Sequence, residues 1–209
     1  MRLVRVWFSK TGSARYISHL DLMRTMTRAF RRAEVAIWYT EGFNRHPYIT
    51  FAAPLSLGFE GLRECMDFKL EDDDVSLEAV AAALDAVMPM GLRVLGATEA
   101  VMKVNRLGYS RYEMTFNCGE EVLRCLESAA ELPVEKKGKK GIRTVDIRPL
   151  MEEMSVQGNL LCVTLPTNCE SAINPALVVT ALRALSGDEG IRAEVVRTAI
   201  LADDRTEFV

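Results

Sequence analysis

The sequence predicts an α+β protein built from two tandem ferredoxin-like units, each with a βαββαβ order and an antiparallel sheet. Two observations lead to this fold class. Strand-like alternation and helix-like periodicity take turns along the chain. The order strand, helix, strand, strand, helix, strand occurs in residues 1–101 and again in residues 107–209. We interpret the recurrence as an internal duplication and expect one domain for each copy.

The first copy opens with a strand followed by a helix. Residues 3–9 (LVRVWFS) alternate and favour a strand. A helix is expected over 18–34, because Ser18 is a suitable N-cap and Asp21 stands at the third helical position. Its apolar residues recur at three- and four-residue spacing and form one core-facing stripe, namely Leu22, Met26, Ala29, Phe30 and Ala33.

Two strands are expected next, over residues 36–40 (AIWYT) and 48–53 (YITFAA). The loop EGFNRHP joins them. Pro47 fixes its own φ angle and disfavours helix at His46, so this loop is stiffer than its length suggests. Trp38 alternates with its neighbours in the first of these strands, which favours a place in the core.

The rest of the first copy is a strand around 65–70, a helix that begins at Ser76 and stops before Pro89, and a strand over 92–97. Residues 98–108 are interpreted as a connector. The second copy has the same order, with a basic turn at 136–143. Its strands are expected at 111–117, 144–147, 160–166 and 193–201, and its helices at 120–130 and 175–186.

Composition is ordinary for a soluble globular protein, with 49% hydrophobic and 26% charged residues. No run of 18 apolar residues occurs, and the N-terminus alternates like a strand, so we expect no membrane association and a cytoplasmic location. The five cysteines contain no CxxC pair, which favours buried thiols over a metal site. We expect no cofactor. The cysteines are Cys65, Cys118, Cys125, Cys162 and Cys169.

Charge is distributed unevenly, although the net charge is −3. Residues 1–50 hold nine basic and three acidic side chains, a balance of +6, and residues 51–101 hold three and ten, a balance of −7. The pattern repeats with +3 for 102–148 (ten and seven) and −5 for 149–209 (four and nine). Local basic surface, rather than the total, decides whether a protein attracts an anionic partner.

A row of arginines lies opposite the apolar stripe of the first helix. Only Asp21 and Glu34 accompany it, too few for the usual ladder of opposite-charge pairs. Two interpretations stay open: a solvated helix face, or a surface that binds phosphate. The arginines are Arg24, Arg28, Arg31 and Arg32.

His19 and His46 are the two imidazoles of the chain, and each is a candidate acid or base near neutral pH. His19 falls on the apolar side of the first turn of its helix, which favours a packed structural role. His46 lies between Arg45 and Pro47 in the loop and is the better functional candidate.

Further RNA-binding candidates lie in the same stretch and in the basic turn. Asn44 and Arg45 can donate to a phosphate or a base edge, and Tyr16 and Tyr39 can stack on bases. A lysine run in the second copy attracts phosphate without reading sequence, or only keeps the loop soluble. These lysines are Lys136, Lys137, Lys139 and Lys140.

Residues 6–58, with FSKTGSARYISHLDLMR, AFRRAEV and YTEGFNRHPYITFAAPLSLG, resemble a radical-SAM-associated domain of unknown function. In bacteria that domain is fused to, or encoded beside, cobalamin-binding radical SAM proteins. The resemblance implies a radical SAM protein as partner. This chain lacks the CxxxCxxC motif of such an enzyme, so the catalytic chain would be elsewhere.

A looser similarity connects the chain to RAMP-class CRISPR repeat-processing endoribonucleases. It implies tandem ferredoxin-like folds and, at His19 or His46, an acid or base for metal-independent cleavage. The glycine-rich loop of those enzymes is not evident in the tail ILADDRTEFV.

Three functions remain open from the sequence. The first is a non-catalytic RNA-binding or substrate-presenting module that works with a radical SAM enzyme. The second is a metal-independent endoribonuclease, and the third is a protein-interaction scaffold.

Overall fold

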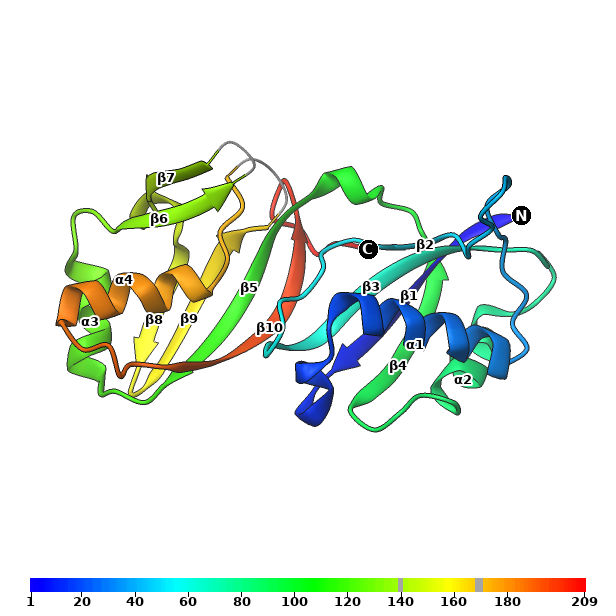
Figure 1. Cartoon of the computed structure of the whole chain (residues 1–209), viewed down its shortest axis with the longest axis horizontal. Helices are drawn as coiled ribbons and strands as arrows, with labels where there is room; N and C mark the ends of the chain where they lie inside the picture. Colours follow the sequence, from blue (N-terminus) through cyan, green and yellow to red (C-terminus); the bar gives the residue numbers. More distant parts are fainter. Residues whose placement is uncertain (139–140, 168–170) are drawn as a thin grey trace. The chain divides into compact units, whose positions relative to one another are not determined.

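The computed structural model shows an α+β protein with antiparallel sheets, which confirms the fold class (Figure 1). The chain divides into two compact units, Met1–Leu107 with Glu207–Val209, and Gly108–Thr206. The return of the last three residues to the first unit is not visible in the sequence pattern. The structure describes residues 1–138, 141–167 and 171–209.

The first unit has the strand order β4-β1-β3, and β2 also pairs with β3. All of these pairs are antiparallel. This order is compatible with the expected ferredoxin-like arrangement. Its elements are β1 (Arg2–Lys10), α1 (His19–Arg32), β2 (Ile49–Phe51), β3 (Glu60–Leu70), α2 (Leu77–Asp85) and β4 (Leu92–Glu99), with short 3-10 turns at Gly12–Tyr16 and Val104–Arg106.

Both helices of this unit pack against one face of the sheet (Figure 1). Alternate residues of β1 and β3 point to that face, because successive side chains of a strand alternate. They form one core with the apolar stripes of the two helices, including Val4, Val6, Phe8, Met66 and Phe68 from the strands and Met26, Phe30, Val80 and Leu84 from the helices.

The second unit has the order β10-β5-β9-β8, and β6 and β7 form a separate hairpin. Apart from the hairpin, the unit repeats the βαββαβ order of the first. Its elements are β5 (Leu107–Phe116), α3 (Glu120–Ser128), β6 (Pro133–Gly138), β7 (Gly141–Asp146), β8 (Glu152–Gln157), β9 (Leu160–Pro166), α4 (Ala176–Ser186) and β10 (Ala193–Ala202), with a 3-10 turn at Arg148–Leu150.

On the other face of the first sheet, the buried Arg5 joins β1 and β3 to the end of the chain. The strand register places Arg5 opposite Asp67, and its Nε and Nη2 atoms donate to the two carboxylate oxygens of Asp67 at 2.7 and 2.8 Å. Nη1 donates to the backbone oxygen of Val209 at 2.8 Å, and the guanidinium lies 4.2 Å from the ring centroid of Phe208. These contacts explain why the last residues belong to the first unit.

The strand expected over 36–40 is wrong. Only isolated bridges form there, from Ile37 to Leu70 and from Tyr39 to Pro47. The segment changes its pairing partner after one residue, and proline has no N–H with which to continue a ladder. β2 is accordingly shorter than the strand expected over 48–53.

The basic stretch at 136–143, expected as a hairpin or turn, lies in the β6–β7 hairpin, whose described strands are Pro133–Gly138 and Gly141–Asp146. The sequence does not predict β8. In β8, half-buried Met154 and Val156 alternate with charged and polar residues. Such a pattern carries little apolar signal, because the strand buries only one face and that only in part.

The cysteines differ from the expectation of buried thiols. Cys65 is buried, Cys118 and Cys162 are half-buried, and Cys125 is exposed on α3. None of these four, which are the cysteines in the described ranges, forms a disulfide; Cys169 lies outside those ranges. Within the same ranges no cluster of three His, Cys, Asp or Glu side chains could hold a metal ion, and no helix is long and apolar enough to cross a membrane.

Candidate nucleic-acid interface

The candidate interface starts from α1, whose N-terminus forms as the sequence predicts. The Oγ atom of Ser18 accepts a hydrogen bond from the Asp21 N–H at 3.1 Å, and its hydroxyl donates to the Asp21 carboxylate at 2.7 Å. Burial of Leu22 and Met26 on the core side fixes the rotation of the helix. The arginine row is therefore exposed along its whole length, at Arg24, Arg28, Arg31 and Arg32.

The loop before β2 lies beside this exposed face. Together they line a groove of about 300 Å³. Its surface is mainly apolar, and three guanidinium groups and one imidazole border it. The lining residues are Leu20, Met23, Arg24, Thr27, Arg28 and Arg31 from α1, and His46 and Pro47 from the loop.

Hydrogen bonds within the loop hold His46 in place beside the groove. Its backbone N–H donates to Thr40 Oγ1 at 3.2 Å, and its carbonyl accepts from the Thr40 N–H at 2.8 Å. Gly42 makes the turn possible, since its φ of 116° is a conformation that side chains rarely allow. The loop thus presents His46 to the groove in a defined position.

The ring of His46 is oriented as well. Its Nδ1 atom lies 3.1 Å from the carbonyl oxygen of Asn44 and 3.0 Å from Thr40 Oγ1. A proton on Nδ1 would donate to the Asn44 carbonyl, whereas a lone pair on Nδ1 would accept from the Thr40 hydroxyl, so the two contacts fit different tautomers. Nε2 has no hydrogen-bond partner among the described residues.

The arginines differ in their partners. Arg24 pairs with Asp21 at 3.2 Å, and hydrogen bonds from the Ser18 hydroxyl and from Arg24 lower the pKa of the Asp21 carboxyl. The Nε atom of Arg31 donates to the Tyr39 hydroxyl at 3.4 Å. Neither Arg28 nor Arg32 has a carboxylate within 4.0 Å in the part of the chain that the structure describes. Their charges are available to an anionic ligand.

Other predicted residues of the first unit do not line the groove. Arg32 is exposed one position beyond Arg31, and Asn44 and Arg45 are exposed in the loop. Tyr16 is 65% exposed, and the guanidinium of Arg15 lies 5.1 Å from its ring centroid.

The lysines belong to the second unit. Lys136 and Lys137 are in β6, where Lys136 Nζ donates to the carbonyl of Ala172. Lys139 and Lys140 lie outside the described residues.

His19 and Trp38 were expected to be packed, and both are more exposed than that. His19 is exposed because it lies in the first turn, ahead of the buried stripe, and its ring only meets Phe51 edge-on at 5.1 Å. Trp38 is half-buried, with its ring 5.8 Å from that of Tyr48 and 4.6 Å from Lys69 Nζ.

Sequence reasoning missed three residues of this region. Leu20 and Met23 line the groove, and Phe43 is fully exposed in the loop between Gly42 and Asn44. The signals were present in the sequence: two apolar residues three positions apart on the polar side of α1, and an aromatic side chain in a glycine-containing polar loop.

Comparison with known proteins identifies the family of this chain but assigns it no activity. No curated protein matches the chain. One similar solved structure is described as an unknown protein from Galdieria sulphuraria; it is 13% identical, with 94% of this chain and 98% of that chain covered and a TM-score of 0.28. A family model described as an uncharacterized protein conserved in bacteria matches residues 3–178. The chain therefore belongs to that family, DUF2344.

Proposed function

We propose that this protein is a non-catalytic RNA-binding or substrate-presenting module that works with a radical SAM enzyme. The observation that supports RNA as the ligand is the groove on α1, where Arg24, Arg28 and Arg31 border an apolar surface. Guanidinium groups bind phosphate in bidentate geometry. An apolar surface beside them suits the face of an unstacked base.

Single-stranded RNA fits this arrangement better than a duplex, because bases in a duplex are stacked and cannot reach an apolar floor. Phe43 extends the same argument, since its exposed ring is next to Asn44 and Arg45. Base stacking on an aromatic side chain contributes about 1–3 kcal/mol. The loop and α1 together would hold one stretch of backbone and one or two bases.

The radical SAM partner rests on the resemblance of residues 6–58. The chain contains no CxxxCxxC motif, so radical chemistry would belong to the partner, and this protein would present the RNA to it.

A second function, metal-independent RNA cleavage, is favoured by one observation. His46 lines the groove, and in the tautomer that donates from Nδ1 to Asn44 the lone pair lies on Nε2. An imidazole in this state can accept a proton from a ribose 2′-hydroxyl. His19 is the weaker candidate, because it does not line the groove.

The proposal is tested by fluorescence anisotropy of labelled RNA titrated with the protein in EDTA, at low and moderate salt. We expect saturable binding that weakens steeply with salt, because phosphate contacts release counterions. The double variant Arg28→Glu/Arg45→Glu should lose binding, and Phe43→Ala should weaken it by about tenfold.

The same samples, run on a denaturing gel, separate the alternatives. RNA that remains intact with the unchanged protein supports a binding module. RNA that is shortened by the unchanged protein, but not by His46→Ala, supports the nuclease. The absence of binding at micromolar protein contradicts both RNA functions and leaves the scaffold.

A further inference from the structure

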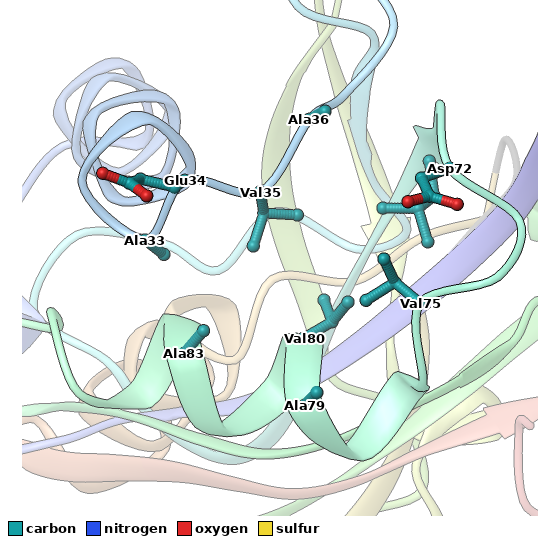
Figure 2. Close-up of a pocket in the computed structure, with 10 residues that line it drawn as sticks. Ala33, Glu34, Val35, Ala36, Asp72, Val75, Ala79, Val80 and Ala83 are labelled. Atoms are coloured by element: carbon teal, nitrogen blue, oxygen red, sulfur yellow. The ribbon is translucent and has the colours of Figure 1, made fainter.

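A second cavity of the first unit lies where α1 ends. It has a volume of about 240 Å³ and is bounded by the chain segment after α1, the end of β3 and one side of α2 (Figure 2). None of its residues lines the groove on α1. They are Ala33, Glu34, Val35, Ala36, Leu70, Asp72, Val75, Ala79, Val80 and Ala83.

Small side chains leave this space open. Ala79 and Ala83 are four residues apart and so lie on one face of α2, and the segment opposite begins with Ala33. Val80 and Leu70 are buried at its base. Figure 2 shows Ala83 and Val80 pointing from α2 toward Val35. The cavity therefore has an apolar interior that fits one aliphatic or small aromatic side chain.

The rim of the cavity is acidic. Glu34 and Asp72 are both exposed, and neither forms an ion pair within 4.0 Å among the described residues. Asp72 Oδ1 accepts from the Asp74 N–H at 2.9 Å, which holds the turn before α2 in place. Asp73 pairs with the amino group of Met1 at 2.7 Å. No lysine or arginine is among the described residues that line the cavity, and the guanidinium of Arg2 lies beside it, where it donates to the carbonyl of the lining Val75.

We propose that this cavity binds a peptide segment of a partner protein, in which an apolar side chain is flanked by lysine or arginine. The apolar side chain enters the cavity, and the basic residues meet Glu34 and Asp72. Complementary charge at a rim adds specificity and speeds association. The same carboxylates repel phosphate, so RNA should not enter this cavity, which shares no lining residue with the groove.

The test uses the full chain and a library of short peptides displayed on phage. We expect selected peptides to carry an apolar residue next to lysine or arginine. Binding of a selected synthetic peptide is then compared between two variants of α2, Ala83→Leu, which fills the cavity, and Ala82→Leu, which makes the same change at an exposed residue that does not line it.

Ala83→Leu should weaken binding of the peptide by about tenfold or more, because the leucine fills the space that the apolar side chain of the peptide would occupy. Ala82→Leu should leave the affinity unchanged. The double variant Glu34→Gln/Asp72→Asn should weaken peptide binding and reduce the salt dependence of that binding. Thermal unfolding of each variant checks that the fold is kept. If no peptide is enriched, or if the enriched peptides are acidic or bind both alanine variants alike, the proposal is wrong. RNA binding by Ala83→Leu should equal that of the unchanged protein, so this test stands apart from the proposed function.

Discussion

At the scale of single residues, Glu34 ends α1 in a backbone conformation that glycine adopts most easily. Its φ is 56°, and the following N–H, of Val35, donates back to the Phe30 carbonyl at 3.0 Å. The left-handed conformation costs a residue with a side chain about 1–2 kcal/mol. A glycine there adds about 0.5–1 kcal/mol of unfolded-state entropy to the cost of folding.

The cost of the left-handed conformation is larger than the entropy cost of a glycine, so Glu34→Gly should raise the free energy of unfolding by about 0.5–1 kcal/mol. Urea unfolding measures the change. Glu78→Gly is the control, because the same substitution in the first turn of α2 should lower stability by up to about 1 kcal/mol. Equal losses in both variants would show that the conformation of Glu34 costs nothing.

Asp67 has a different role, because its partner is fully buried. Asp67→Ala leaves the guanidinium of Arg5 without its carboxylate, and breaking such a pair costs about 3–5 kcal/mol. Glu207→Ala removes one partner of the exposed pair with Arg63 and should change stability by less than about 1 kcal/mol. Chemical unfolding of both variants checks this contrast, and similar losses would contradict the assigned burial.

At the scale of elements, the Asp85 carboxylate joins the end of α2 to β4. It accepts from Arg93 Nη2 at 2.8 Å and from the Val94 N–H at 2.8 Å. The hydrogen bond from Arg93, and then that from Val94, lower the pKa of the Asp85 carboxyl. A pKa that is lower in the folded state adds stability above its unfolded value, and this stability is lost as the pH falls through the folded value.

Asp85→Asn should therefore lower stability at pH 7 and flatten its dependence on pH below about 4, the range in which an aspartate titrates in the unfolded chain. Urea unfolding at several pH values tests this. Curves for the two proteins that stay parallel in acid would contradict the assigned role.

The sequence predicts well those helices and strands that are specified by nearby residues, such as an N-cap or an alternating apolar pattern. Ser18 and Ser76 both accept the hydrogen bond that starts their helices, and β9 occupies the residues expected for it. The strand prediction for residues 36–40 is wrong because the β-favouring residues Ile37 and Tyr39 pair with different parts of the chain, Ile37 with Leu70 and Tyr39 with Pro47. Strand pairing depends on distant partners, which local pattern does not contain.

The candidate site, too, depends on contacts between distant residues that a local sequence pattern does not contain. The arginine row follows from helical periodicity alone, so it could be predicted and is exposed as expected. The groove could not, because it needs the loop with His46 and Pro47 to return beside α1. Leu20 and Met23 then change from unexplained apolar residues on a polar face into the floor of the groove.

At the scale of the whole molecule, two units repeat one order of elements, but they differ in what their surfaces offer. The first unit carries both the basic groove and the acidic cavity, which lie along and beyond α1. The second unit adds the β6–β7 hairpin with Lys136 and Lys137. If both proposed sites bind, one chain would hold an RNA and a protein at the same time, as the proposed presenting module requires.

The central claim is that the groove, rather than general positive charge, binds RNA. Arg28 and Arg32 test it as a matched pair: both are exposed on α1 and lack an ion pair among the described residues, but only Arg28 lines the groove. The decisive measurement is the salt dependence of single-stranded RNA binding for Arg28→Ala and Arg32→Ala. We predict that Arg28→Ala weakens binding and lowers the slope of log K against log salt by about 0.7, the loss of one phosphate contact, while Arg32→Ala changes neither. Equal effects of the two substitutions, or none from Arg28→Ala, would contradict a binding site in the groove.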